Sequence, residues 1–350
     1  MNSLRFVVMA GICLVMTLSI SSVRAQEQTS TPGSFSGTVY SDYYWVAQNH
    51  DESIVNENGV WFRRIYFTYN RDIASGFSTR LRLEMDSDGS FSDQAMKMTP
   101  VVKDAYLKWK KEEHEIVAGI SGTPTWGVIE DVWSYRSVEK SPLDLFGMGS
   151  SRDLGLSFKG SLLPKGSLNY HFMVGNGNSN RANEINQGKK WMLSLGYELS
   201  EDLLVEIYGD YDDRIGSSDR YTLQLFGAYE TDTFSLGALY SRQTRQNAIP
   251  AGDLDVQLAS VFSHFDIAGK TRGFLRLDHA FDGIPGTDDN DYLPISSTTS
   301  STFLTSGVDY TLAEGIHLQP NVEMVIYGED ANGISPDTDI IPRITLAYRF

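Results

Sequence analysis

Apolar and polar side chains alternate along most of the chain after residue 35. In the segment 76–86, for example, Leu81 and Leu83 alternate with Arg80 and Arg82. Successive side chains of a β-strand point to opposite faces, whereas a helix repeats every 3.6 residues and would scatter these charges around its surface. The pattern therefore predicts strands that each have one apolar and one polar face.

Sixteen segments show this alternation, and their connections differ in length in a regular way. The segments are 35–47, 60–70, 76–86, 99–110, 114–121, 152–160, 167–175, 189–199, 203–212, 219–230, 233–243, 254–267, 271–281, 302–312, 315–328 and 341–350. Short connections, such as 231–232, alternate strictly with longer ones, such as 244–253. The alternation slips in 35–47, 99–110 and 254–267.

Sorted connections are typical of an up-and-down transmembrane barrel, with short turns on the periplasmic side and long loops outside. A β-sandwich has no reason to sort its connections in this way. We therefore predict an all-β fold, a 16-stranded antiparallel transmembrane β-barrel with a long third external loop folded into the lumen. An even number of strands would put both termini on the periplasmic side.

The first 25 residues have the features of an export signal. Arg5 precedes an apolar run over 6–20, and Val23 and Ala25 stand where a signal peptidase needs small residues. The run is too short for a membrane-spanning helix, which is the alternative. We predict a cleaved signal peptide over 1–25, a short periplasmic lead-in over 26–34 and one barrel domain over 35–350. The only cysteine, Cys13, would leave with the signal peptide.

The last strand supports the same location. Ile344, Leu346, Tyr348 and Phe350 share one face, which would meet lipid in a barrel whose exterior is apolar. A C-terminal Phe on such a strand resembles the signal that the outer-membrane insertion machinery reads. The alternative is the last strand of a soluble sheet.

Charge on the other face of the strands predicts a water-filled lumen. Barrels of 16 to 18 strands leave an aqueous channel, and unpaired charge in a dry core costs several kcal/mol per ion. We expect the following residues to line the pore: Arg64, Arg80, Arg82, Glu84, Asp86, Glu206, Asp210, Arg272, Arg276, Asp278 and Arg343. The alternative is the solvent face of a soluble sheet. A net charge of −16 argues against a nucleic-acid binder.

The connection 122–151 is long and unusually apolar for a loop. Ile129, Trp133 and Arg136 have helical spacing, and Pro142 ends that stretch. We expect the loop to fold into the barrel mouth and narrow it, although it could instead cover a neighbouring subunit. Its expected constriction residues are Trp126, Glu130, Asp131, Trp133, Arg136, Glu139 and Lys140.

Several short stretches resemble the phosphate-selective porin O/P-like family. They are 61–69, 80–86, 103–109, and the Thr-Pro-Thr-Trp sequence at 123–126 with the Ser-Ser-Arg-Asp-Leu-Gly exit at 150–155. The resemblance covers most of the mature chain and implies a homotrimeric 16-stranded porin with a third loop in the lumen. Anion-selective members line their pores with arginines and lysines. Here the expected lining mixes both signs, so we predict that Arg80 and Arg82 pair with acidic neighbours and that the pore is weakly selective.

No other chemistry is indicated. The histidines have no nucleophile or metal spacing, and the acidic stretches 86–89 and 288–291 lack a calcium-loop pattern. We expect no enzyme activity, cofactor or metal. The sequence predicts a porin in the bacterial outer membrane, in contact with lipid and lipopolysaccharide, through which ions and small hydrophilic solutes diffuse. The alternatives are a substrate-specific anion channel and a non-conducting barrel that serves as an adhesin or scaffold.

Overall fold

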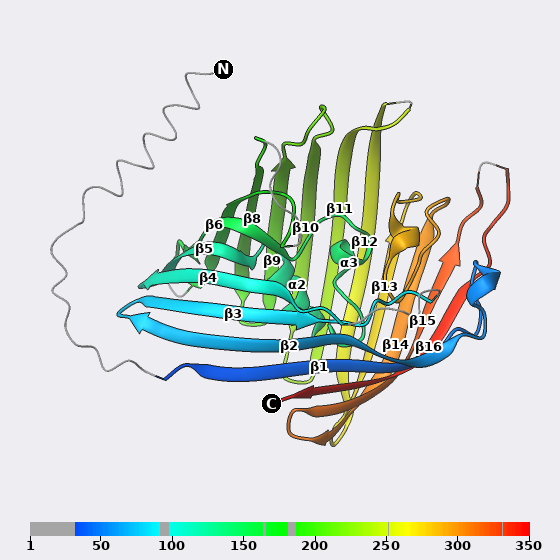
Figure 1. Cartoon of the computed structure of the whole chain (residues 1–350), viewed down its shortest axis with the longest axis horizontal. Helices are drawn as coiled ribbons and strands as arrows, with labels where there is room; N and C mark the ends of the chain where they lie inside the picture. The colour runs from blue at the N-terminus through cyan, green and yellow to red at the C-terminus, as the bar shows by residue number, and fades with distance from the viewer. Residues whose placement is uncertain (1–31, 92–97, 164–165, 181–186, 251, 331) are drawn as a thin grey trace. The chain divides into compact units, whose positions relative to one another are not determined.

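The computed structural model describes residues 32–350 except 92–97, 164–165, 181–186, 251 and 331. The predicted signal peptide and most of the lead-in lie outside the described residues. From Gly33 onward the chain forms one closed barrel of 16 strands (Figure 1). The strands are β1 (Ser34–Trp45), β2 (Asn58–Ala74), β3 (Phe77–Met85), β4 (Val101–Lys111), β5 (His114–Gly122), β6 (Arg152–Ser161), β7 (Leu168–Gly175), β8 (Lys190–Ser200), β9 (Leu203–Asp212), β10 (Arg220–Glu230), β11 (Phe234–Ile249), β12 (Gly252–Ala268), β13 (Thr271–Ala280), β14 (Ser301–Ala313), β15 (Ile316–Tyr327) and β16 (Asp339–Arg349).

Each strand pairs antiparallel with its neighbours in sequence, and β1 pairs with β16 to close the sheet. The closing register runs from Thr38 opposite Arg349 to Tyr44 opposite Arg343. The predicted fold class is confirmed. We call the edge with the short connections the turn end and the opposite edge the loop end.

One connection differs from the sequence prediction. The expected loop 244–253 is mostly strand, because β11 continues to Ile249 and β12 begins at Gly252. Thr244 lies opposite Asp255 in the ladder, and its hydroxyl donates to that carboxylate at 2.6 Å. Arg242 pairs with the same carboxylate at 2.6 Å. Thr244, expected in a loop, thus forms a cross-strand pair, and such pairs stabilise a hairpin.

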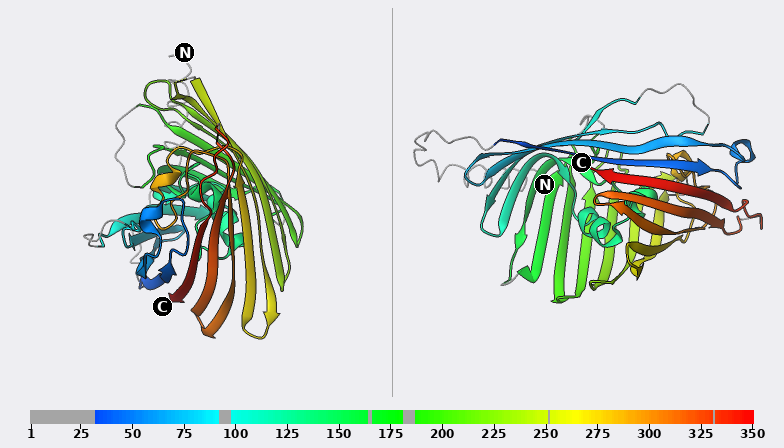
Figure 2. Two further views of the ribbon diagram at one scale, coloured as in Figure 1. Left: turned by 90° about the vertical axis from the view of Figure 1, so that its right-hand side faces the viewer. Right: turned by 90° about the horizontal axis from the view of Figure 1, so that it is seen from below.

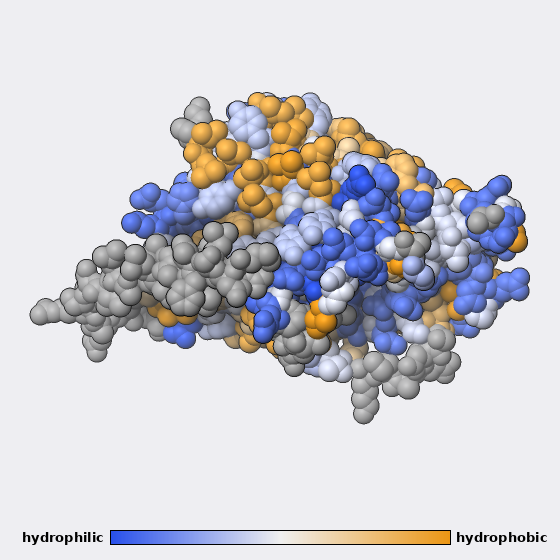
Figure 3. Space-filling model, turned by 90° about the horizontal axis from the view of Figure 1, so that it is seen from above, coloured by the Kyte–Doolittle hydropathy of each residue, from blue (hydrophilic) through white to orange (hydrophobic). Residues whose placement is uncertain are grey.

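The outward faces of the strands are apolar and exposed. Leu193, Leu223 and Leu275 are examples, and Figure 3 shows hydrophobic residues gathered in a broad patch of the surface in that view. The last strand follows the same rule, since Ile344 and Leu346 are exposed and Phe350 is 72% exposed. An apolar exterior of this kind is typical of barrels that face lipid, where its burial removes apolar surface from water.

Two β-bulges change which side chains point inward. In β2 the ladder shifts beside Tyr40 and Ser41, which pair with Arg64 and Phe62, so Arg63 is the extra residue. In β4 the shift lies between partners Asp104 and Val102, so Lys103 is the extra residue. A bulge breaks strict alternation. Arg63 and its neighbour Arg64 therefore both contact charged groups inside the barrel, and so do Lys103 and Asp104.

The long connection after β5 contains two helices, α2 (Trp126–Trp133) and α3 (Pro142–Leu145), and α2 lies inside the ring of strands (Figure 2). Two sequence expectations need correction here. The first helix ends at Trp133 rather than beyond Arg136, because Ser134 adopts a left-handed conformation with φ of 59°. Pro142 begins a helix instead of only ending one, since proline suits a first helical position. No helix in the described part of the chain is long and apolar enough to cross a membrane.

Candidate functional site

The long loop packs its apolar side chains against one half of the inner wall. Trp133 lies edge-on to Phe262 and Phe274, with ring centroids 5.8 and 6.2 Å away. Tyr135 stacks on Phe274 at 4.3 Å. Ile129 and Trp133 are buried in the same apolar cluster. One half of the barrel interior is therefore a packed core, and the loop is held against it by the hydrophobic effect.

An ion pair is enclosed in this core. Arg276 and Asp278 are both 0% exposed, and the guanidinium Nε lies 3.0 Å from each carboxylate oxygen. Arg276 also donates to the carbonyl of Lys140 in the loop, and its guanidinium lies 5.4 Å from the ring centroids of Trp133 and Phe303. The pair therefore holds the loop to the wall through a charged group whose hydrogen bonds and ring contacts offset its burial.

A second charged cluster fixes the loop beside the seam between β1 and β16. Arg63 lies 3.1 Å from Glu139 of the loop and donates to the carbonyl of Val138. Arg343 lies 3.8 Å from Glu139 and 2.7 Å from Glu323. Burial alone would raise the pKa of Glu139, but these arginines and Lys140 lower that pKa to about 2. Glu139 is thus an anionic anchor of the loop.

The unfilled half of the interior contains three polar cavities that share Arg152. Two lie toward the turn end: a first turn-end cavity of about 890 Å³ and a second of about 700 Å³. A loop-end cavity of about 320 Å³ lies toward the other edge. Arg152, the first residue of β6, lines all three. Arg152 therefore contacts polar space toward both edges of the barrel.

Three arginines share one carboxylate on this wall. Asp104 lies 2.5 Å from Arg152, 3.4 Å from Arg82 and 3.9 Å from Arg80. Arg80 also donates to Asn70, and Arg82 donates to Thr68. Because one negative charge serves three guanidinium groups, the wall carries an excess of positive charge.

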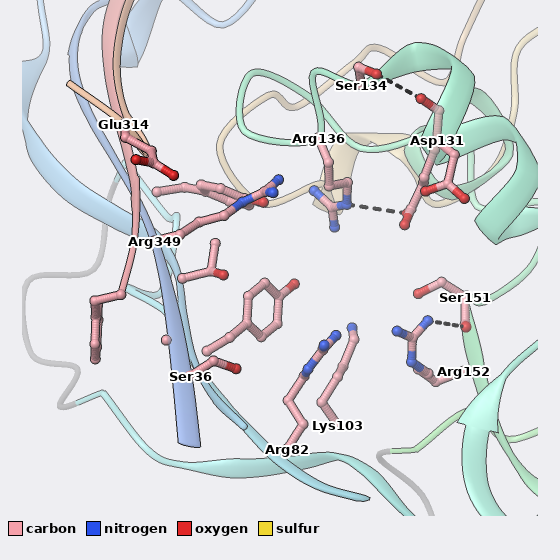
Figure 4. Close-up of a pocket in the computed structure, with 17 residues that line it drawn as sticks. Ser36, Arg82, Lys103, Asp131, Ser134, Arg136, Ser151, Arg152, Glu314 and Arg349 are labelled. Atoms are coloured by element: carbon pink, nitrogen blue, oxygen red, sulfur yellow. Dashed lines mark hydrogen bonds and ion pairs between the residues drawn. The ribbon is translucent and has the colours of Figure 1, made fainter. Parts of the chain in front are cut away.

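The loop presents acidic groups to the same space. Glu130 and Asp131, near the C-terminal end of α2, line both turn-end cavities. Glu130 pairs with Arg136 at 3.4 Å, and burial raises the pKa of Asp131. In Figure 4, Arg82, Lys103 and Arg152 extend into one space opposite these loop residues. The first turn-end cavity is lined by five basic and three acidic residues, whereas the second is lined by four basic and seven acidic residues, so the lining is mixed.

The residues expected in the pore fall into two groups. Arg80, Arg82 and Glu206 line a turn-end cavity, and Arg272 is exposed near the turn end, paired with Asp266 at 2.6 Å. The others are enclosed or engaged in ion pairs and do not themselves line the three cavities. These are Arg64 with Glu84 and Asp86, Asp210 with Lys190, Arg276 with Asp278, and Arg343 with Glu323.

Dense inward charge was expected to require a water-filled lumen, and this expectation is wrong for Arg276, Asp278 and Arg343. They are buried under the loop, and pairing makes their burial tolerable. Of the expected constriction residues, Glu130, Asp131 and Arg136 line a cavity, whereas Trp126, Trp133 and Glu139 are buried as anchors. The main chain of Lys140 accepts from Arg276.

Sequence reasoning missed Lys103 and Arg152 as cavity residues. Lys103 lies on a bulge and contacts Glu84 at 2.8 Å, and the only trace of the bulge in the sequence is the slipped alternation in 99–110. Arg152 precedes Asp153, so alternation could assign only one of them to the lumen. Among the described residues, no group of three or more His, Cys, Asp or Glu side chains is placed to hold a metal ion.

Comparisons with known proteins support the fold without a sequence match. No protein-family model matches the chain, and no curated protein sequence matches it. It is similar to the anion-selective porin from Comamonas acidovorans (TM-score 0.67, 13% identity, 91% of this chain and 99% of that chain). It is also similar to the outer membrane channel DcaP of Acinetobacter baumannii (TM-score 0.66, 13% identity, 94% and 100%). A third similar structure is the trimer form of OmpT, an outer membrane protein of Vibrio cholerae (TM-score 0.61, 13% identity, 92% and 100%). The chain shares its fold with these outer-membrane proteins.

Proposed function

We propose that this protein is an outer-membrane porin, a water-filled channel for passive diffusion of ions and small hydrophilic solutes. The observation that carries the proposal is the set of three polar cavities beside the loop, all of which are lined by Arg152. The apolar exterior fits lipid, and the fold is that of solved porins and channels. Transport of this kind is driven by the solute gradient and needs no catalytic group.

The selectivity that we propose is modest and favours anions. The excess of arginine around Asp104 attracts anions, while Glu130 and Asp131 on the loop oppose a strong preference. Rings and walls of charged side chains set the sign of the permeant ion. The second candidate is a substrate-specific anion channel, as in the phosphate-selective family that the sequence resembles. The observation that favours it is the group of three arginines that share only one carboxylate, Asp104.

Export, insertion and assembly belong to the same proposal. A signal peptide over 1–25 would direct the chain across the inner membrane. The outward row of Ile344, Leu346 and Tyr348 on β16, with Phe350 directly after the strand, would be read by the insertion machinery. The mature protein would assemble as a homotrimer in contact with lipid and lipopolysaccharide. Trimerisation is named for the similar Vibrio cholerae protein.

Liposome swelling tests diffusion directly. We expect liposomes that contain the folded protein to swell quickly in arabinose and progressively more slowly in larger neutral sugars, because the cavities beside the loop limit solute size. Liposomes with heat-unfolded protein serve as the control. Swelling no faster than this control, for every sugar, would contradict the porin and favour a non-conducting scaffold.

A further inference from the structure

Basic side chains outnumber carboxylates beside the loop-end cavity. Arg220, the first residue of β10, lies directly opposite Arg245 on β11 and, on its other side, opposite Asp212 on β9. Arg214, in the connection before β10, lines the cavity together with Arg220. Like charges directly opposite each other on neighbouring strands are destabilising. Asp212 supplies one negative charge to this group but lies 3.8 Å from Arg214, so the positive charge of the three arginines exceeds it.

Arg245 finds no compensating negative charge in the described part of the protein. Its side chain is buried, the residue being 6% exposed. Its guanidinium donates only to neutral oxygens, those of Gln243 at 2.8 Å, Gly147 at 3.1 Å and Pro285 at 3.5 Å. Gln243 and Gly147 themselves line the loop-end cavity, so the charge of Arg245 lies directly behind the cavity wall. A buried cation with neutral partners alone is costly.

The carboxylates at this cavity are already engaged. Asp153 accepts from the backbone N–H groups of Gly177 and Leu154 at 2.8 and 2.9 Å. Asp212 lies 3.8 Å from Arg214, and Lys190 pairs with Asp210 at 3.0 Å. Arg220 forms no ion pair within 4.0 Å with any described residue. It is thus the cation of this wall with unused donors.

We propose that the loop-end cavity is a binding site for the carboxylate or phosphate group of a small anion, held by Arg220 with Arg214 and supported by the field of Arg245. The planar guanidinium fork matches both oxyanions and binds them through two parallel hydrogen bonds. A cavity of about 320 Å³ is at the small end of ligand pockets. Arg152 lines both this cavity and the first turn-end cavity, so an anion bound here lies near a basic residue that also contacts the space toward the turn end.

This proposal rests on the proposed function, because the site would bind an anion that enters the channel from the loop end. Its test does not depend on conduction. The detergent-solubilised protein is titrated into inorganic phosphate, observed by phosphorus NMR, and into carbon-13-labelled succinate, observed by carbon NMR. Line broadening measures binding. We expect broadening of at least one signal, and a decrease in affinity of about tenfold in Arg220→Gln, since a charge-assisted hydrogen bond is lost. The anion that broadens identifies which oxyanion the site takes.

The matched control is Arg272→Gln, which removes an equal charge near the turn end from a residue paired with Asp266. We expect it to bind as the unchanged protein does. Equal broadening in both variants and the unchanged protein, or no broadening in any of them, would overturn the site. Conductance recorded in parallel separates the two proposals. Conductance without line broadening would support the porin and contradict the site, whereas broadening without conductance would support the site and contradict the porin.

Discussion

Replacing Arg152 by glutamate is expected to turn a weak anion preference into a cation preference. The change removes one positive charge and adds one negative charge at a residue that lines all three cavities. Two unit charges acting at about 8 Å in water change the energy of a permeant ion by about 1 kcal/mol. The anion permeability should therefore fall about fivefold and the cation permeability rise by a similar factor. The measurement is the reversal potential of planar bilayers in a tenfold salt gradient.

The control for this change is Arg272→Glu. Arg272 has the same charge and is 45% exposed near the turn end, where water screens it. Its reversal potential should stay close to that of the unchanged protein. If Arg152→Glu also left the reversal potential unchanged, Arg152 would not lie on the ion path. A strong anion preference in the unchanged protein would contradict the mixed lining and favour the substrate-specific channel.

Replacing Arg276 by methionine should destabilise the protein and loosen the loop. The substitution leaves Asp278 buried without a partner and removes the donor to the Lys140 carbonyl and the cation beside Trp133. Breaking a buried ion pair in this way costs about 3–5 kcal/mol. The midpoint of heat-induced unfolding, followed by gel migration and circular dichroism, should fall by about 6–10 °C. Single-channel current should also become noisier.

A double variant separates the buried charge from lost packing. In Arg276→Met with Asp278→Leu, no charge is left uncompensated, and apolar replacements of a buried pair are often neutral or stabilising. The double variant should therefore regain most of the lost stability, while the current noise persists because the contact with Lys140 is still missing. A double variant less stable than the single variant would contradict this role for the pair.

The architecture could be predicted because each strand alternates independently and connection lengths are visible in the sequence. The extension of β11 to Ile249 and of β12 back to Gly252 escaped this reasoning, since Thr244 and its neighbours are polar residues typical of a loop. Their pairing depends on the partner strand rather than on local preference. Phe226 and Phe262 are apolar although they lie inside the barrel, because they belong to the buried cluster that the loop forms with the wall.

The lining was harder to predict than the fold. Bulges add an extra residue, so the inward positions of Arg63 and Lys103 do not follow from counting along β2 and β4. Burial of the Arg276–Asp278 pair depends on where the loop lies, which is a tertiary property. The sequence supplies the charges, whereas the loop decides which of them reach the cavities.

Cysteine accessibility at position 152 tests the central claim. This claim is that solutes pass Arg152 on their way between the loop and the barrel wall that carries Arg80 and Arg82. The only natural cysteine, Cys13, lies in the predicted signal peptide, so the mature protein offers a clean background. A negatively charged thiol reagent, added to single open channels of Arg152→Cys in a planar bilayer, should lower the current in a step that a reductant reverses. The same reagent should have no effect on Leu193→Cys, which lies on the outward face of β8. Modification of Cys at position 152, verified by mass spectrometry, without any change in current would contradict the account.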